Sequence, residues 1–302
     1  MNALLVAMRV SRYLPRTVVR AGAWAGSSVG WLRKTKARRR LDDNLHRVTG
    51  LSGRELSRLS RKGMLSAGRY YAEVLELPRV TPAQADARVR IANPEPAVSA
   101  IHEAGGAVVA LGHSGNWDLV GYFSTRAIAP VTSVAEVLKP REVFETFVEL
   151  RERVGIRIYG HEGSATFRSL LREAKHKEER ILALVADRDL SGSGIEVTMW
   201  GHRVKVAPGP AALAMASGTP LVPLAVHYER LRGARRRAAR SRWGVVMHFG
   251  EMLYPADFAG PDAVAEMSQR WAAWLAQGIA EHPEDWHMLQ RFGWVEPDGE
   301  AP

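Results

Sequence analysis

The chain has 302 residues, of which 46% are hydrophobic and 25% are charged, and it contains no cysteine. This composition is typical of a folded globular protein, and the lack of cysteine excludes disulfides, thiolate zinc sites and a cysteine nucleophile. Every uninterrupted apolar run is shorter than the ~18 residues that a membrane-spanning helix needs, so no such helix is predicted.

The net charge of +10 comes from two short segments rich in arginine. They are RKTKARRR (33–40) and RLRGARRRAARSR (230–242), which together hold 13 basic residues and no acidic ones. The rest of the chain holds 29 basic and 32 acidic residues. Basic residues concentrated in this way indicate an anionic partner surface, either a membrane or a nucleic acid.

The first predicted element is a basic amphipathic helix within residues 3–32, which Pro15 kinks or splits. Four arginines are spaced three, four and four residues apart: Arg9, Arg12, Arg16 and Arg20. This spacing places them along one side of a helix. We interpret residues 1–40 as helices that lie in a membrane interface, the alternative being a helix packed on the protein body with its arginines in water.

A helix is predicted over residues 55–76, and from about residue 105 strands alternate with helices. The predicted strands are 107–111, 132–137, 156–160, 181–187, 195–200, 220–228 and 244–250, and the later helices are 141–154, 165–178, 208–217 and 262–281. This alternation predicts an α/β fold, with a central mixed sheet flanked by helices and a helical, basic N-terminal region, all in one domain (1–302). Residues 230–242 fall between two predicted strands, so we expect an exposed loop there.

A dense polar cluster follows the first predicted strand, in the sequence LGHSGNWDL (111–119). On a continuous helix His113 and Asp118 would lie about 140° apart, so they meet only if His113 sits in a turn and Asp118 in the helix that follows. Gly115 permits such a turn because it adopts positive φ easily. Asp118 would then hold one imidazole nitrogen and leave the other as a base. The alternative is a capping histidine near a solvated aspartate.

The segment LGHSGNWDL contains the H-x-x-x-x-D motif of the glycerolipid acyltransferase superfamily, in the form typical of its bacterial lipid A acyltransferase branch. Further segments resemble, in the same order, the phosphatidylinositol mannoside acyltransferases. They are TSVAEVLKP (132–140), FVELRERVGI (147–156), ADRDLSGSGIEVTMWG (186–201), PGPAALAMASGTPLVP (208–223) and HPEDWHMLQ (282–290). The resemblance covers residues 105–290, whereas the first hundred residues share only a helical and basic character.

The resemblance implies an enzyme that moves a long-chain acyl group, palmitoyl above all, from acyl-CoA to a mannose hydroxyl of a phosphatidylinositol mannoside. His113 would be the general base and Asp118 its partner within the motif. Acyl-CoA is already activated, so neither a covalent intermediate, a metal nor any cofactor beyond this co-substrate is expected. Both lipids are amphiphilic, so we expect a peripheral enzyme on the cytoplasmic face of the cell membrane.

The resemblance also implies further site residues. The family places a glutamate where this chain has Asp187, which either supports His113 or leaves that role to Asp118. The candidate substrate-binding residues are Asn116, Glu136, Lys139, Arg151, Arg188 and His287. Asn116 is alternatively a helix cap, and Glu136 and Arg151 a structural ion pair. Lys139 and Arg188 are expected to contact CoA phosphates. His287 contacts the acceptor or is a structural histidine.

The basic segments are assigned to an anionic membrane, which the N-terminal arginines contact together with Arg235, Arg236 and Arg237. A nucleic-acid partner is not expected, because no aromatic residue lies within either arginine-rich segment. The apolar stretch 208–226 lines an acyl groove or belongs to the core. The alternative functions are acyl transfer to a different glycolipid or to a lysophospholipid, or hydrolysis of acyl-CoA by a thioesterase on the same scaffold. The sequence has no G-x-S-x-G motif, which argues against a serine esterase.

Overall fold

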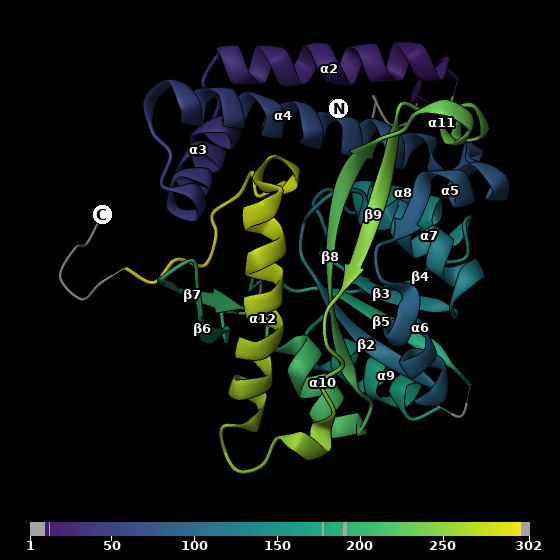
Figure 1. Cartoon of the computed structure of the whole chain (residues 1–302), viewed down its shortest axis with the longest axis vertical. Helices are drawn as coiled ribbons and strands as arrows, with labels where there is room; N and C mark the ends of the chain where they lie inside the picture. Colours follow the sequence, from purple (N-terminus) through teal and green to yellow (C-terminus); the bar gives the residue numbers. More distant parts are fainter. Residues whose placement is uncertain (1–9, 12, 177, 190–191, 297–302) are drawn as a thin grey trace.

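The computed structural model describes residues 10–296 except 12, 177 and 190–191, and its centre is a seven-stranded sheet (Figure 1). The strands are β1 (Val89–Ile91), β2 (Gly106–Leu111), β3 (Val131–Ala135), β4 (Arg157–Gly160), β5 (Arg180–Val185), β8 (Leu221–Arg230) and β9 (Trp243–Phe249). Their order is β1-β9-β8-β2-β5-β3-β4. Neighbours are parallel except β8 and β9, which are antiparallel. The predicted α/β fold with a mixed central sheet is confirmed.

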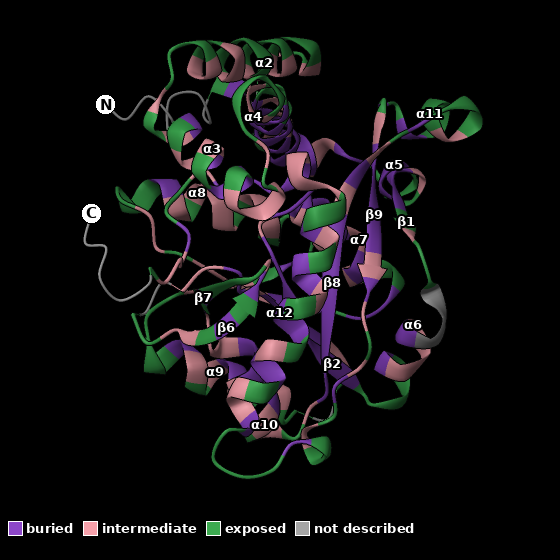
Figure 2. Cartoon of the chain, turned by 60° about the vertical axis from the view of Figure 1, so that its left-hand side comes forward, coloured by how far each residue is buried: buried purple, intermediate pink, exposed green. Residues whose placement is uncertain are grey.

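The middle strand β2 is buried along its whole length, because both faces of the sheet are covered. Val108 and Ala110 belong to one apolar core, and Ala107 and Val109 belong to the other. The first face packs against α9 (Ser164–Ala174), α10 (Gly209–Ser217), α12 (Ala263–Glu281) and the hairpin of β6 (Ile195–Met199) and β7 (His202–Val206). The second packs against α5 (Pro82–Arg88), α6 (Pro94–Glu103) and α7 (Trp117–Ala127). Figure 2 shows the buried residues concentrated in these strands.

Three N-terminal helices form a layer across one end of the sheet (Figure 1). They are α2 (Arg16–Leu32), α3 (Lys36–Thr49) and α4 (Gly53–Glu76). The remaining helices are η1 (Leu77–Arg79), α8 (Arg141–Glu152), α11 (Gly233–Ala239), η2 (Pro255–Asp257) and η3 (Pro283–Asp285). Helices α2 and α4 touch closely at Gly68, where an added Cβ would lie 2.1 Å from Ser27 Oγ.

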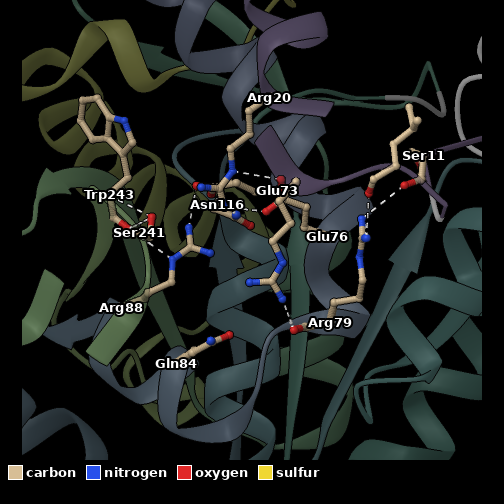
Figure 3. Close-up of polar contacts among 12 residues, drawn as sticks. Ser11, Arg20, Glu73, Glu76, Arg79, Gln84, Arg88, Asn116, Ser241 and Trp243 are labelled. Atoms are coloured by element: carbon tan, nitrogen blue, oxygen red, sulfur yellow. Dashed lines mark hydrogen bonds and ion pairs between the residues drawn. The ribbon is translucent and has the colours of Figure 1, made fainter. Parts of the chain in front are cut away.

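The described arginines of the N-terminal helix point toward the protein, which differs from the expected membrane-facing row. Arg20 forms an ion pair with Glu76 (2.5 Å), a carboxylate on α4 that is 1% exposed (Figure 3). Arg16 donates to the carbonyl of Arg79. A buried carboxylate requires a cationic partner, and Arg20 supplies it. Arg9 and Arg12 lie outside the described residues.

The outward face of α2 is consequently apolar. Its exposed residues carry no charge, and the larger ones are Val18 (49% exposed), Trp24 (59%), Val29 (45%) and Leu32 (67%). Helix α2 therefore has the reverse arrangement from a solvated surface helix, with cations inward and apolar side chains outward. Across the part of the chain that the structure describes, no helix combines the length and the apolar character needed to cross a bilayer.

The elements after residue 105 form close to their predicted positions, with two differences, and one strand before residue 105 was also missed. The short strand β1 and the strand β7 were not predicted. Residues 230–242 were predicted as an exposed loop but contain α11, which fits their alanine and arginine content. The stretch 208–226 forms α10 and most of β8, and many of its side chains are fully buried in the core.

Candidate active site

The parallel strands β2, β5 and β3 end at the same edge of the sheet, and the predicted site residues follow them. Leu111 of β2 pairs with Val185 of β5. His113 and Asp187 each lie two residues beyond this pair, and Glu136 directly follows β3. The carboxyl edge of a parallel sheet is where open α/β proteins place their ligands.

The Asp187 carboxylate holds His113 directly. Its Oδ1 lies 2.6 Å from the ring Nδ1 of His113, and its Oδ2 accepts the backbone N–H of the same residue at 3.0 Å. The indole N–H of Trp286 also donates to Oδ2, at 2.9 Å. Burial alone would raise the pKa of Asp187, but the His113 ring and these hydrogen bonds lower it below the ordinary value.

This arrangement defines the tautomer of the histidine. The ionised Asp187 accepts a hydrogen bond from Nδ1–H of His113, so in the neutral imidazole Nε2 is the nitrogen with the free electron pair. Within the described residues Nε2 has no protein hydrogen bond. The turn is the predicted one: Gly115 has a φ of 58°, and α7 begins at Trp117. The His113 side chain is 33% exposed, so its ring reaches the surface of a pocket.

Asp118 does not contact the imidazole, which corrects the expectation that it holds one ring nitrogen. Its carboxylate, 3% exposed, accepts from the Tyr70 hydroxyl (2.8 Å) and from Arg151 (2.5 and 3.1 Å). Burial alone would lower the pKa of Arg151, but Asp118 raises it above the ordinary value, so the guanidinium group stays charged. Asp118 thus fixes α7 to α4 and α8. The alternative Glu136–Arg151 ion pair does not form either, since Glu136 pairs with Arg188 at 2.7 Å.

Replacing Asp118 by alanine is expected to lower the free energy of unfolding by about 3–5 kcal/mol, because Arg151 is left buried without its counter-charge. The double substitution Asp118→Ala/Arg151→Met is expected to recover part of this loss. Urea denaturation followed by circular dichroism measures both values. A loss below about 1 kcal/mol for Asp118→Ala would show that the pair does not stabilise the fold.

Asn116 is a helix cap and does not line the pocket. It is fully buried, its Oδ1 accepts from Leu119 N at 2.9 Å, and its Nδ2 donates to Glu73 at 2.7 Å (Figure 3). Glu73 is itself buried and paired with Arg88 at 2.6 Å. The cap is therefore oriented by an ion pair on the side away from the reaction pocket, which contradicts the expected substrate contact.

A late segment of the chain braces the turn that carries His113. His287 N donates to the carbonyl of His113 at 2.7 Å, and Gly115 N donates to the carbonyl of Asp285 at 2.9 Å. The Asp285 carboxylate in turn accepts from the Tyr228 N–H at 2.7 Å. The turn is thus held between strand β8 and the residues that follow η3.

His287 carries an unused acceptor inside the site. The Ser66 hydroxyl donates to Asp285 (2.6 Å), so the His287 Nε2 at 3.0 Å from Ser66 Oγ is the protonated nitrogen. Nδ1 of His287 is buried and has no hydrogen-bond partner. Burial, reinforced by Arg69 and His113, lowers the pKa of His287 to about 3, so the ring is neutral at physiological pH.

These groups surround a pocket of about 250 Å³. The predicted site residues that line it are His113, Asp118, Glu136, Arg151, Arg188 and His287. Asp187 does not line the pocket but holds His113 from behind. Lys139 is exposed and is not part of the lining. Among the described residues, no three His, Asp or Glu side chains converge as metal ligands.

The apolar part of the pocket comes from a different segment than expected. Its walls are formed by β3, α8, β4 and the segment between α8 and β4, including Val134, Phe144, Phe147, Ile156 and Ile158. The stretch 208–226 contributes nothing to the lining and is core, as its alternative interpretation held. The residues that sequence reasoning missed are Tyr70 and Trp286, which hold Asp118 and Asp187. Trp286 lies inside HPEDWHMLQ, so that resemblance was the available signal.

Comparison with known proteins connects this geometry to a family. The sequence profile of the family described as bacterial lipid A biosynthesis acyltransferase matches residues 2–292. The chain belongs to this family. A relative from Mycolicibacterium smegmatis, named phosphatidylinositol mannoside acyltransferase, is 30% identical over 283 residues, which are 93% of this chain and 87% of the relative. A relative of the same name from Mycobacterium tuberculosis is 34% identical over 253 residues, 83% of this chain and 75% of the relative.

Among solved structures, the family member resembles the 1-acyl-sn-glycerophosphate acyltransferase PlsC from Thermotoga maritima. The identity is 14%, the TM-score is 0.39, and the match covers 76% of this chain and 83% of that one. The assignment to the family rests on the sequence match along the chain. It is an acyltransferase family, and the site described above lies within the matched residues.

Proposed function

We propose that the protein transfers a long-chain acyl group, palmitoyl above all, from acyl-CoA to a mannose hydroxyl of a phosphatidylinositol mannoside. The observation that carries this proposal is the contact between His113 and Asp187. It presents an unprotonated Nε2 to a pocket that has both polar and apolar walls. The two mycobacterial relatives support the choice of acceptor through their names.

In the proposed reaction Nε2 of His113 takes the proton of the mannose hydroxyl as its oxygen attacks the thioester carbonyl. The positive end of α7 faces the motif and stabilises the oxyanion that forms. The carbonyl reforms, the C–S bond breaks, and the CoA thiolate leaves and takes the proton from the imidazolium. Asp187 stabilises the imidazolium throughout. The thioester supplies the activation, so this mechanism uses no covalent enzyme intermediate and no resident cofactor.

The pocket residues suit the two substrates in different ways. The unpartnered Nδ1 of His287 accepts a hydrogen bond from a sugar hydroxyl, and the exposed carboxylate of Glu136 accepts another. The apolar wall from β3, β4 and α8 receives the acyl chain. Arg188 lines the pocket and supplies positive charge for the CoA phosphates. The exposed Lys139, in the segment after β3, adds a second positive charge.

Incubation with palmitoyl-CoA and a panel of glycolipid acceptors, followed by mass spectrometry, tests the reaction. The expected result is acylated mannolipid and free CoA in equal amounts, with turnover that depends on the acceptor. CoA release at the same rate without any acceptor would instead establish a thioesterase. Preference for a lysophospholipid in the same panel would overturn the acceptor assignment.

We also propose that the protein binds the cytoplasmic face of an anionic membrane, where both lipids and acyl-CoA meet. The uncharged outer face of α2 supports this, because an exposed helix face without charge is suited to insertion among lipid head groups. The exposed arginines Arg236 and Arg237 add electrostatic attraction. Arg235 contributes less, since it pairs with Glu229 at 2.9 Å.

The double substitution Val29→Ser/Leu32→Ser is expected to weaken binding to anionic vesicles by about tenfold or more, because it removes two large apolar side chains from the inserted face. Vesicle flotation measures this change. The matched control is Tyr254→Ser, which removes a side chain of the same exposure as Val29 (45%) elsewhere on the molecule. Equal vesicle binding by all three proteins would remove α2 from the interface.

A further inference from the structure

A large cavity among the described residues lies apart from the reaction pocket, on the other side of α4. Its volume is about 1130 Å³, and it is lined by α2, α4, α11, the end of β8 and the start of β9. Figure 1 shows α11 between the end of β8 and the start of β9, at the same end of the sheet as α2 and α4. Tyr70 and Tyr71 of α4 line the reaction pocket, whereas Arg69 and Glu73 of the same helix line this second cavity.

The second cavity is strongly positive. Seven arginines and one carboxylate line it. Arg20 is paired with Glu76, and the Glu73 carboxylate is occupied by Arg88 (2.6 Å), Asn116 (2.7 Å) and Tyr228 (3.1 Å). Among the described residues, the other six arginines of the lining have no carboxylate within ion-pair distance; they are Arg69, Arg230, Arg236, Arg237, Arg240 and Arg242. Like charges gathered around one cavity repel each other unless an anion binds among them.

Two of these guanidinium groups are held in place by an aromatic ring. The Cζ atoms of Arg69 and Arg230 lie 3.5 and 4.2 Å from the ring centroid of Trp243, and Arg69 also lies over Tyr228. Stacking keeps a guanidinium group oriented while its N–H donors stay available to a ligand. The cavity is therefore a partly preorganised receptor for the oxygen atoms of a phosphate group.

Most of the remaining lining is apolar and continues onto the outer face of α2. Ala21 and Trp24 from α2 and Leu65 and Ala72 from α4 complete the wall, and Trp24 is 59% exposed. A ligand that fills this cavity therefore needs a phosphate group next to a hydrocarbon portion. A phospholipid has this chemistry, and its acyl chains would continue along the uncharged face of α2.

A nucleic acid fits the cavity less well. Single-stranded nucleic acids bind by stacking their bases on open aromatic faces. Here Trp243 is already in contact with two guanidinium groups, and Trp24 is the only other aromatic residue of the lining among the described residues. The charge attracts phosphate, but the cavity offers no row of free rings.

We propose that this arginine-lined cavity is a discrete binding site for the head group of one anionic phospholipid, separate from the site of acyl transfer. The bound lipid would be neither acyl donor nor acceptor; it would hold α2 and α11 on the membrane. The proposal goes beyond the acyl-transfer reaction, and its test measures binding alone, so each of the two can fail without the other.

Isothermal titration with short-chain lipids kept below their micelle concentration tests this site. Dihexanoyl phosphatidylglycerol is expected to bind one-to-one and saturably, and dihexanoyl phosphatidylcholine at least about tenfold more weakly. Arg236→Gln/Arg237→Gln should weaken binding about tenfold or more, because two charges near the ligand are lost. Arg236→Lys/Arg237→Lys should also weaken it, by about three- to tenfold, since lysine cannot make the paired contacts of arginine.

Two controls define the site. Arg168→Gln/Arg172→Gln removes two exposed charges from α9, and His113→Ala alters only the reaction pocket; both should bind the lipid as the wild type does. Equal binding by the lysine variant would overturn the proposal, because it would show diffuse attraction. The proposal would also be overturned if the α9 variant weakened binding equally, or if phosphatidylcholine bound with equal affinity. The same holds if inorganic phosphate bound as tightly as the lipid, or if a short DNA duplex displaced the lipid at equal salt.

Discussion

Replacing His113 by alanine is expected to lower the rate of acyl transfer by about 10²–10⁴-fold, the loss typical of a missing general base. The physical reason is that Nε2 is an unprotonated nitrogen at the pocket surface, with Nδ1 engaged by a buried carboxylate. The measurement is the initial rate of acylated lipid formation with palmitoyl-CoA and the preferred acceptor.

A matched control is His176→Ala, which removes an exposed histidine at the end of α9, away from the pocket. It should leave the rate unchanged within about twofold. If His113→Ala kept a near-normal rate while folding cooperatively, the mechanism would have to be assigned to another base.

The second large effect is expected at Asp187. Asp187→Asn keeps the shape of the side chain but replaces one oxygen with an amide that donates, so Nδ1 of His113 can no longer give its proton. The proton then moves to Nε2, which cannot accept one from the substrate, and turnover should fall by about 10²–10⁴-fold. Asp187→Glu, which keeps the charge in a fully buried site, should retain more activity than Asp187→Asn.

The pH dependence of stability gives an independent reading of the same residue. The folded protein lowers the pKa of Asp187, so its ionised form stabilises the fold above the ordinary aspartate pKa of about 4. This contribution is lost as the pH falls through the lower, folded value. The difference in free energy of unfolding between wild type and Asp187→Asn should therefore be constant near neutral pH and shrink in acid.

In the activity measurement, equal rates of acyl transfer by Asp187→Asn and Asp187→Glu would contradict the role given to the carboxylate.

The overall architecture could be predicted because its strands are patterned locally. The all-apolar run of β2 and the alternation of strands and helices after it are visible in the sequence itself. Strand β1 was missed because it has only three residues, and β7 because HRVKV follows a predicted strand after a turn of two residues. Short elements carry too little pattern to be distinguished from loops.

The partner of His113 could not be chosen from the sequence, since it depends on which strands are neighbours. Asp118 is five residues from His113, whereas Asp187 is 74 positions away and arrives there through the parallel pairing of β2 with β5. The orientation of α2 was likewise hidden. The spacing of Arg16 and Arg20 shows that they share a side, but only the buried Glu76 on α4 determines which way that side turns.

The brace behind the turn that carries His113 has a consequence for the order in which the protein matures. The turn after β2 is completed by backbone hydrogen bonds to Asp285 and His287, and Ser66 reaches His287 across 221 positions of sequence. A ribosome adds about 5–20 residues per second, so the turn emerges many seconds before its brace does. Contacts this distant in sequence also form late in folding. The turn that carries His113 should therefore reach its final geometry only after the C-terminal segment has docked.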